Sequence, residues 1–328
     1  MVFAAVLVSV AYGLPLRDPD NFAGPNYVRL PAILLLAYIT DVIPRAVHRA
    51  RGVRGMKVAF LEVTGERWQW EHVRFLILGL GTWYLTYVAF RNLKSFAPFV
   101  NSTLWDRELA AFDQVLFLGQ DPSTLLHQLL GSGVAAHAMS AIYLLWIGFV
   151  PVSLAAALVW SRNRSGGAWY VTAVAVDWAL GVAVYYAVPS LGPVYAKPQD
   201  FSGLTHTHMT DLQAIMITER QEVLADPHAT DAVQTIAAFA SLHVAILVTA
   251  CLVARLLGLH RLVQRALWGF LALTVLATVY LGWHYFVDVL GGFLIGAAAL
   301  WVAAIATNNH VRGRPVHVPE PVADDALT

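Results

Sequence analysis

The segment "YLGWHYFVDVLGGFLIG", Tyr280 to Gly296, lies in one of the most apolar parts of the chain and yet carries a histidine and an aspartate. His284 and Asp288 are four residues apart, a little over one helical turn, so a helix here stacks the imidazole and the carboxylate on one face. Gly292 and Gly296 continue at the same interval and predict a stripe of small residues for close helix packing. The segment therefore predicts a tightly packed helix with a polar couple at its beginning.

The composition is that of a membrane protein. The 328 residues are 58% hydrophobic and 13% charged, with a mean hydropathy of +0.60, well outside the range of a soluble domain. The net charge is zero, so the chain offers no electrostatic argument for a nucleic-acid partner. Cys251 is the single cysteine, which excludes an intramolecular disulfide and a thiolate metal cluster. We therefore expect an all-α polytopic membrane protein.

Seven apolar segments approach the length that crosses a hydrocarbon core of roughly 30 Å. The amino-terminal stretch, residues 1–15, is either a short eighth span or a half-buried helix, and it lacks the basic start of a cleaved signal peptide. The expected organisation is amino-terminal spans within 1–50, a six-span core at 72–306 and a disordered cytoplasmic tail at 307–328. The seven segments are residues 28–44, 72–92, 133–160, 168–188, 238–258, 264–283 and 285–305.

Positive charge is distributed unequally between the two sets of alternating connections. Fourteen of the 21 Lys and Arg residues fall in residues 45–74, 161–167, 255–265 and the tail. By the positive-inside rule these connections and both termini are cytoplasmic, in what we expect to be a bacterial plasma membrane. The long connections 93–132 and 189–237 then lie outside.

The two outer connections carry helix signals of their own. Residues 93–132 are amphipathic and too charged to span, and Asp121-Pro122 is typical of an N-cap followed by the first helical position. Residues 210–226 predict a polar helix. We expect these helices to lie at the outer interface and to cover a pocket.

The topology brings a second histidine to the depth of the first. "AFASLH", Ala238 to His243, begins a span on the outer side, and "GWHYFVD" turns on that same side. Charged groups within a span cost several kcal/mol unless they are paired or solvated, so such residues are functional candidates. A hydrogen-bonded couple that locks two helices is the structural alternative for His284 and Asp288.

These residue types suit phosphoryl transfer. A carboxylate at Asp288 that accepts a hydrogen bond from one ring nitrogen of His284 leaves the other nitrogen as a nucleophile. His243 facing it can protonate a leaving oxygen, which is the general-acid role. Ser241 and the free N–H groups of its helix turn would bind an anion. Together they suggest a phosphohistidine intermediate.

At this point the residues match a family. "ASLH" and "YLGWHYFVDVLGG" resemble the second and third signature motifs of the type-2 phosphatidic acid phosphatase superfamily, over about residues 72–305. The resemblance implies a six-helix membrane core and an enzyme without metal or cofactor. It also implies His284 as nucleophile, His243 as general acid and Asp288 as the residue that orients His284.

Three departures resemble the inositol phosphorylceramide synthase branch. This chain has Ser-Leu-His in place of Ser-Gly-His, Thr278 in place of an Arg six residues before the histidine, and "PSLGPVYAK" where a Lys-x6-Arg-Pro motif is expected. Fewer cations compensate a phosphomonoester dianion poorly, which favours a phosphodiester donor. The remaining candidates for binding phosphate are Arg91, Lys94 and Lys197, with solvated loop charges as the alternative.

The leading hypothesis is a phosphotransferase acting on a lipid phosphate or phospholipid head group at the outer face, with phosphoinositol as one group it could transfer. A lipid phosphate phosphatase is the alternative within the superfamily. A proton-coupled transporter would predict internal repeats, and none is visible. A serine hydrolase using Ser241 lacks a Gly-x-Ser-x-Gly context. Asp177, in mid-span, is interpreted as a structural residue, and His206 and His208 as ordinary loop histidines.

Overall fold

The computed structural model describes residues 1–20, 26–50 and 52–309, and within those ranges the secondary structure is helical, with no strand. The predicted tail from 310 onward lies outside the described residues. Short helical turns occur at Val53–Gly55 (η2), Pro193–Ala196 (α9) and Pro198–Phe201 (η4), and a π-helical turn, Ala156–Trp160 (η3), extends α7. The longer helices are α1 (Val2–Tyr12), α2 (Asn26–Arg49), α3 (Met56–Arg67), α4 (Trp70–Val100), α5 (Asp106–Leu116), α6 (Pro122–Leu130), α7 (Val134–Ala155), α8 (Arg164–Ala187), α10 (His208–Ala225), α11 (Leu242–Leu256), α12 (Arg261–Tyr280) and α13 (Phe286–Ala306).

Six of the described helices are long and apolar enough to cross a membrane, namely α2, α4, α7 with η3, α8, α12 and α13. Two of the eight predicted segments form shorter apolar helices instead, namely α1 and α11. At a rise of 1.5 Å per residue, the 11 residues of α1 extend about 16 Å, which fits the half-buried helix rather than a span. α11 has only 15 residues because the chain becomes helical at Leu242, after Ser241 caps it, and not at 238.

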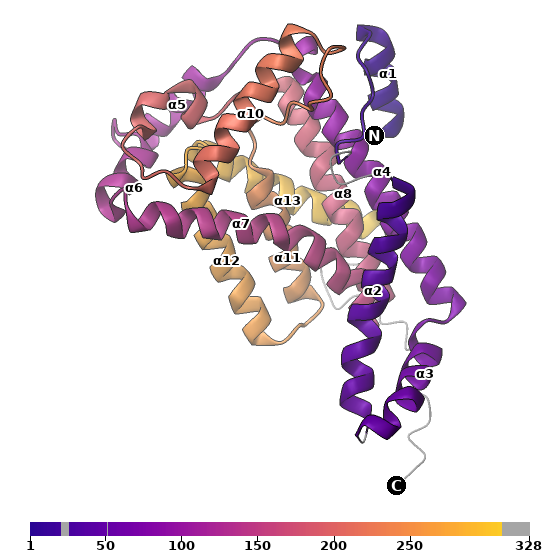
Figure 1. Ribbon diagram of the computed structural model, residues 1–328. Helices are drawn as coiled ribbons and strands as arrows, with labels where there is room; N and C mark the ends of the chain where they lie inside the picture. The colour runs from indigo at the N-terminus through magenta and orange to yellow at the C-terminus, as the bar shows by residue number, and fades with distance from the viewer. Residues whose placement is uncertain (21–25, 51, 310–328) are drawn as a thin grey trace.

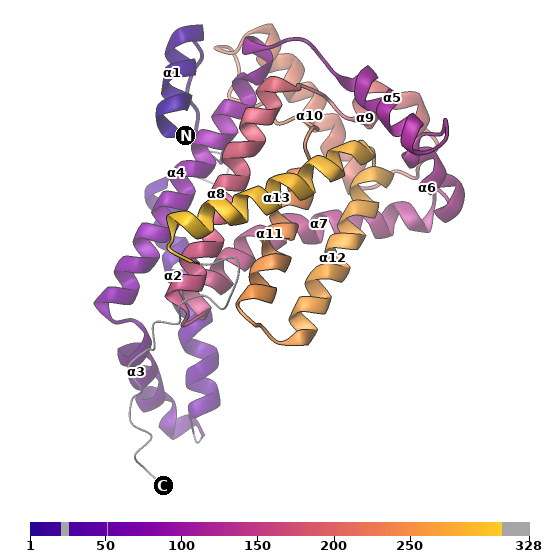
Figure 2. The same ribbon diagram turned by 180° about the vertical axis from the view of Figure 1, so that it is seen from behind.

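α11 lies at the centre of the bundle and packs against α8, α12 and α13 (Figure 1). A helix surrounded by protein does not need to match the full bilayer thickness, which explains how so short a helix serves as core. α5, α6 and α10 gather at the end of the bundle opposite α3, in both views (Figures 1 and 2). These are the predicted helices of the two long outer connections, and Asp121 and Pro122 occupy the predicted cap and first positions of α6.

The glycine stripe of α13 packs against α11 as predicted. A Cβ added at Gly292 would lie 2.4 Å from the carbonyl oxygen of Ser241, and one at Gly296 would lie 2.5 Å from that of Ala245. Only glycine allows the two backbones to come this close. The close approach fixes the position of α11 relative to the helix that carries Asp288.

A buried ionic cluster attaches the α2–α3 hairpin to η3, at the end of α7. Asp41 of α2 is fully buried and accepts a hydrogen bond of 2.8 Å from Arg67 Nε, while Arg67 Nη2 donates to the carbonyl oxygen of Val159 at 3.0 Å. The second carboxylate oxygen of Asp41 accepts from Arg45. The partners satisfy a charge that would otherwise be costly to bury. This cluster holds α2 beside the end of α7.

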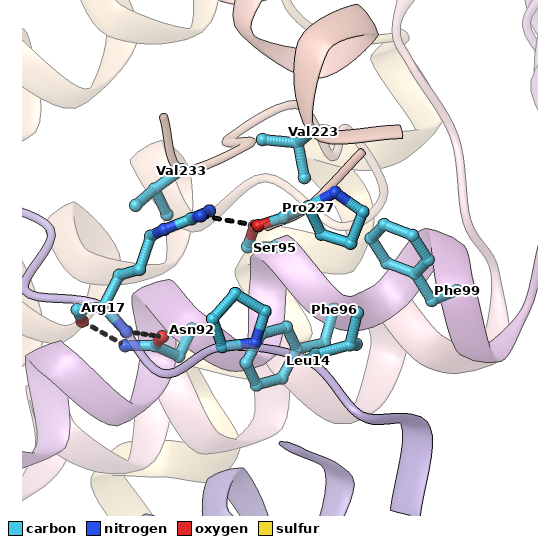
Figure 3. Close-up of a pocket in the computed structure, with 10 residues that line it drawn as sticks. Leu14, Arg17, Asn92, Ser95, Phe96, Phe99, Val223, Pro227 and Val233 are labelled. Carbon is cyan, nitrogen blue, oxygen red and sulfur yellow. Dashed lines mark hydrogen bonds between the residues drawn. The ribbon is translucent and has the colours of Figure 1, made fainter. Parts of the chain in front are cut away.

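The segment after α1 connects the carboxyl-terminal part of α4 to the connection that follows α10 (Figure 3). The Asn92 side chain makes two hydrogen bonds with the backbone of Arg17. It accepts from the Arg17 N–H and donates to the Arg17 carbonyl oxygen, each at 2.8 Å. The Arg17 guanidinium donates to the carbonyl oxygen of Pro227, as Figure 3 shows, and also to that of Ala232. The amino-terminal segment thus helps to hold the outer connection 226–233 in place.

Candidate active site

A tight turn at the end of α12 positions His284. The N–H of Trp283 donates to the carbonyl oxygen of Thr278 at 2.9 Å and that of Gly282 to Val279 at 3.1 Å, the pattern of a Schellman cap. Gly282 has a φ of 73°, and an added Cβ there would meet the Phe201 ring at 2.5 Å. The turn therefore requires glycine at Gly282, and it delivers His284 between α12 and α13.

The beginning of α13 holds the His284 ring in one orientation. Asp288 Oδ2 accepts from His284 Nδ1 at 3.2 Å and from the backbone N–H of Tyr285 at 3.0 Å. His284 and Asp288 are both buried, with side chains 3% and 0% exposed. The predicted histidine–aspartate couple is therefore present in the geometry. With Nδ1–H donating to the carboxylate, Nε2 carries the lone pair.

α11 supplies the second histidine at its first turn. Ser241 is the N-cap, and its side chain accepts from the N–H of Val244. His243 lies in the first turn that Ser241 caps. Ser241 itself is fully buried and does not line the cavity described below, so the structure does not bring its hydroxyl to the place predicted for an anion.

Three side chains form a continuous hydrogen-bonded chain with Asp288. His243 Nδ1 lies 2.8 Å from His284 Nε2, and His243 Nε2 lies 3.0 Å from the hydroxyl oxygen of Tyr143 on α7. One order of protons satisfies every contact: Tyr143 donates to His243, His243 Nδ1–H donates to His284, and His284 Nδ1–H donates to Asp288. In this order both imidazoles are neutral.

Burial, and after it the nearby Lys94 ammonium, lower the pKa of the His284 imidazole from its ordinary value. A lowered pKa keeps the ring unprotonated at neutral pH, because protonation would place a second positive charge in a buried site. The lone pair on Nε2 is therefore available for bonding to an electrophile.

Both histidines line a cavity of about 970 Å³. Charged side chains from the segment before α2, from α4 and from α10 line it, whereas most of the other lining side chains are apolar and belong to α2, α4, α7, α8, α10 and α11. The charged residues are Asp20, Arg91, Lys94 and Glu219. A cavity with one charged end and a long apolar part has the polarity of an amphiphile.

Among the cations predicted to bind phosphate, Lys94 has the surroundings best suited to that role. Its Nζ lies 5.0 Å from the ring centroid of Tyr185 and 5.9 Å from that of Phe90, and among the described residues no carboxylate is within ion-pair distance of it. Arg91 lines the same cavity and donates to the hydroxyl of Tyr87 at 2.9 Å. The predicted pair Arg91 and Lys94 therefore reaches the cavity that contains the histidines.

Lys197 occupies a different place. Its ammonium pairs with Asp121 at 3.2 Å, and the side chain lines a small separate hollow that His284 also lines. The structure thus brings two of the three predicted cations to the main cavity and leaves Lys197 in an ion pair beside it.

Helix α5 contributes two buried carboxylates that sequence reasoning missed. Asp113 accepts from the N–H groups of Phe286 and Val287, at 2.6 and 2.8 Å, and so caps the first turn of α13. Asp106 accepts from the N–H groups of Leu191 and Gly192 and from the hydroxyl of Tyr285 at 3.0 Å. α5 therefore ties the chain beside His284 to the connection after α8. Burial raises the pKa of Asp113 to about 6, although the two N–H groups oppose this.

The other polar features have structural partners. Asp177 is fully buried and accepts from the hydroxyl of Thr249 at 2.9 Å, in agreement with a structural role. His206 pairs with Asp211 at 3.1 Å. Across the described part of the chain, no group of three or more His, Cys, Asp or Glu side chains is arranged to hold a metal ion.

Comparison with known families tests the resemblance to the superfamily. A family model described as the PAP2 superfamily matches residues 107–302, more than half of the chain, and this range contains His243, His284 and Asp288. The chain belongs to the PAP2 superfamily. Comparison with curated proteins and with solved structures gives no match. The inositol phosphorylceramide synthase branch remains a prediction.

Membership of the PAP2 superfamily supports an integral membrane enzyme of the lipid phosphatase and phosphotransferase class, with lipid phosphates as substrates. The helical membrane fold is the one predicted. Thr278, which stands where the superfamily motif has arginine, is fully buried, and its hydroxyl donates to the carbonyl oxygen of Thr274 at 2.9 Å. This PAP2 protein therefore has no cation or free hydroxyl at that position.

Proposed function

We propose that this protein transfers a phosphate-containing group from a lipid donor through a phosphohistidine on His284, at the outer face of the membrane. The observation that carries the proposal is the chain from Tyr143 through His243 and His284 to Asp288, in which a lone-pair nitrogen faces a nitrogen that carries a proton. A nucleophile, an acid and an orienting carboxylate in contact are the parts that covalent catalysis needs.

In the first step the donor phosphate enters between the two imidazoles. His284 Nε2 attacks phosphorus, and the bond from phosphorus to the leaving oxygen breaks. His243, which takes up a second proton when the phosphate anion binds, gives its Nδ1 proton to that oxygen and becomes a neutral imidazole. Asp288 stabilises the positive charge that develops on His284. Lys94 and Arg91, which line the cavity, balance the charge on the phosphoryl oxygens.

In the second step an acceptor hydroxyl attacks the phosphohistidine. His243, now without its proton, takes the proton from that hydroxyl, and the phosphorus–nitrogen bond breaks to restore His284. Transfer and hydrolysis differ only in whether a lipid hydroxyl or water attacks. The apolar cavity supports a lipid acceptor, and the uncharged position at Thr278 supports a phosphodiester donor such as phosphatidylinositol, which carries one negative charge.

A labelling experiment tests the intermediate. Detergent-purified protein is incubated with radiolabelled phosphatidylinositol or phosphatidic acid, quenched, and analysed for a phosphoprotein that is labile in acid and stable in base. We expect the adduct in the wild type and its loss in His284→Ala. An adduct that persists in His284→Ala, or no adduct and no product with any lipid phosphate, would contradict the proposal.

A second experiment separates transferase from phosphatase. Purified protein receives phosphatidylinositol, phosphatidic acid or polyprenyl phosphate, each with and without ceramide or diacylglycerol, and the products are identified by mass spectrometry. Transfer predicts a new phosphorylated lipid that appears only with an acceptor. Release of the head-group phosphate at the same rate with and without acceptors would instead establish the lipid phosphate phosphatase alternative.

A further inference from the structure

The three residues that connect His284 to Asp288 all bond to helix α5. The hydroxyl of Tyr285 donates to Asp106 Oδ1 at 3.0 Å. The next two residues along the chain donate their backbone N–H groups to Asp113, at 2.6 and 2.8 Å. At 11 residues α5 is too short to cross a membrane. A helix beside the spans therefore holds the segment between the two residues.

The turn that precedes His284 is held in the same way from α6 and α10. His127 of α6 donates through Nε2 to the carbonyl oxygen of Tyr280 at 2.8 Å, and Gln213 of α10 donates to that of Leu281 at 2.9 Å. α5, α6 and α10 gather at one end of the bundle (Figures 1 and 2). The position of His284 therefore depends on these helices as well as on α12 and α13.

Asp106 also reaches the segment that leads to His243. Its carboxylate accepts from the N–H groups of two successive residues in the connection after α8, at 3.0 and 2.9 Å. Ser190 directly precedes these two residues. Its carbonyl oxygen accepts from the N–H of Ala238 at 3.0 Å, and its hydroxyl accepts from that of Phe239 at 2.9 Å. Asp106 thus connects the backbone segments beside both histidines.

Both carboxylates of α5 are buried, Asp106 at 8% exposure and Asp113 at 2%. A buried carboxylate is costly unless hydrogen-bond donors satisfy it. Asp113 gives one oxygen to each of two N–H groups, and Asp106 bonds three donors. These donors belong to the segments beside the histidines, so the position of those segments is coupled to α5.

Phosphoryl transfer depends on the position of His284 Nε2. The nitrogen has to approach phosphorus in line with the leaving oxygen. A displacement of about 1 Å lowers such a rate by on the order of a hundredfold. The two N–H groups that Asp113 holds directly precede Asp288 in the chain, so a shift of that turn moves the carboxylate that orients the His284 ring.

We propose that Asp106 and Asp113 are positioning residues for the reaction at His284. They hold the segment from His284 to Asp288, and Asp106 also holds the approach to His243, so that the two imidazoles keep the separation that transfer requires. Neither carboxylate lines the main cavity, so neither touches the substrate there. The inference rests on the proposed function, because it assigns the two carboxylates to that reaction.

A carboxylate that only stabilises the fold has different consequences. Its loss lowers the melting temperature but leaves each folded molecule with the kcat of the wild type. The loss of a positioning residue lowers the kcat of the folded molecules. KM changes little, because the substrate binds in a cavity that neither carboxylate lines.

Two mild substitutions separate these roles. Asp113→Asn keeps the size of the side chain and one acceptor oxygen, whereas Tyr285→Phe removes only the hydroxyl that donates to Asp106. Glu108→Gln is the matched control, because Glu108 lies on α5 and is exposed. The substrate is radiolabelled phosphatidylinositol or phosphatidic acid, whichever labels the wild type. kcat and KM are measured at neutral pH, well below every melting temperature, and kcat is expressed per folded protein in the monodisperse gel-filtration peak.

We expect Asp113→Asn to lower kcat by about ten- to a hundredfold and Tyr285→Phe by about five- to tenfold, with KM within about twofold of the wild type. Glu108→Gln should keep both constants within about twofold. A double-mutant cycle provides a second measurement. In Asp106→Ala the acceptor is absent, so adding Tyr285→Phe should lower kcat by less than about twofold further.

Three results would overturn the positioning role and leave the proposed function intact. They are a kcat per folded molecule within about twofold of the wild type in both mild variants, an increase in KM with kcat unchanged, and an undiminished effect of Tyr285→Phe in the Asp106→Ala background. If Asp113→Asn does not fold, Tyr285→Phe and the cycle decide. A wild type that forms neither adduct nor product with any lipid phosphate would instead overturn the proposed function.

Discussion

At the scale of single residues, the site depends on which nitrogen of each histidine makes which hydrogen bond. His284 uses Nδ1 for Asp288 and keeps Nε2, while His243 uses Nδ1 for His284 and Nε2 for Tyr143. The hydrogen bond from the Tyr143 hydroxyl to Nε2 thus determines which His243 nitrogen carries the proton. A residue on a third helix therefore controls the protonation of the acid.

Replacing Tyr143 with Phe removes one hydrogen bond to His243 Nε2 and preserves the ring that stacks on Trp283. A hydrogen bond of about 1 kcal/mol corresponds to a rate change of roughly five- to tenfold. We expect kcat to fall by that factor with KM unchanged, and the alkaline limb of the pH–kcat profile, where the acid His243 loses its proton, to move. The profile of the phosphotransfer reaction, recorded for both proteins, is the measurement. An unchanged kcat and profile would show that Tyr143 does not act through His243.

Asp113 makes a prediction about pH. Its pKa rises from an ordinary value of 3.8 to about 6 in the folded protein, so between about pH 4 and pH 6 the folded state binds more protons than the unfolded state. The contribution of Asp113 to the free energy of unfolding therefore decreases as pH rises through this window. The difference in melting temperature, wild type minus Asp113→Asn, should decrease from pH 4 to pH 6 and then stay constant.

Glu108→Gln is the matched control for this measurement, because Glu108 lies on the same helix and is exposed. Its melting temperature should track that of the wild type across the same pH range. A difference between wild type and Asp113→Asn that grows with pH would contradict the raised pKa.

At the scale of elements, the pair α11 and α13 sets the distance between the His243 and His284 imidazoles. His243 belongs to α11, Asp288 belongs to α13, and the glycine stripe holds the two backbones together. A shift of either helix therefore changes the contact between the imidazoles, even though the glycines touch neither ring.

Gly292→Ala tests this coupling. The added methyl group would lie 2.4 Å from the Ser241 carbonyl oxygen, so the helices must separate. We expect a loss of stability of roughly 1–3 kcal/mol, seen as a lower melting temperature, and a fall in kcat larger than the loss of folded protein explains. Gly269→Ala in α12 is the control, because its methyl group would meet no atom within 4 Å and alanine favours a helix. Equal melting temperatures for the two variants would show that the close approach is not required.

Sequence reasoning succeeded at this scale where periodicity and topology acted together. The interval of four from His284 to Gly296 predicted both the polar couple and the packing stripe. The cap signal Asp121-Pro122 predicted α6, and the polar pattern of residues 210–226 predicted α10. It missed Asp106 and Asp113, because carboxylates on an amphipathic helix have the pattern of a solvated face. It also assigned Ser241 to an anion, whereas its hydroxyl caps α11 and its carbonyl oxygen packs against Gly292.

At the scale of the whole molecule, the charge distribution predicts that the α5–α6 side faces outward and the α2–α3 connection faces the cytoplasm. The structure places these regions at opposite ends of the bundle (Figure 1). Tyr143 shows the limit of sequence at this scale. It stands in an apolar run without a motif, and only the packing of α7 against the other helices brings it to His243.

Cysteine labelling tests this orientation. The single native cysteine, Cys251, is buried, so its background reactivity is low. Leu118 and Val53 are 94% and 91% exposed on the two opposite sides. In intact cells a membrane-impermeant maleimide should label Leu118→Cys and spare Val53→Cys, and permeabilised cells should show both. Labelling of Val53→Cys in intact cells would reverse the proposed orientation of the active site.

The direct bond between His243 and His284 has a consequence for selectivity against soluble anions. In the resting protein each imidazole occupies the place where a phosphate would bind, so any phosphate has to break that contact before it can react. Free inorganic phosphate brings nothing else to the site that offsets this loss. A lipid held in the membrane by its hydrocarbon chains keeps its phosphate beside the pair at high effective concentration. If phosphate reacts at His284 as proposed, the resting contact therefore favours a phosphate that the membrane holds beside the pair over one that is free in solution.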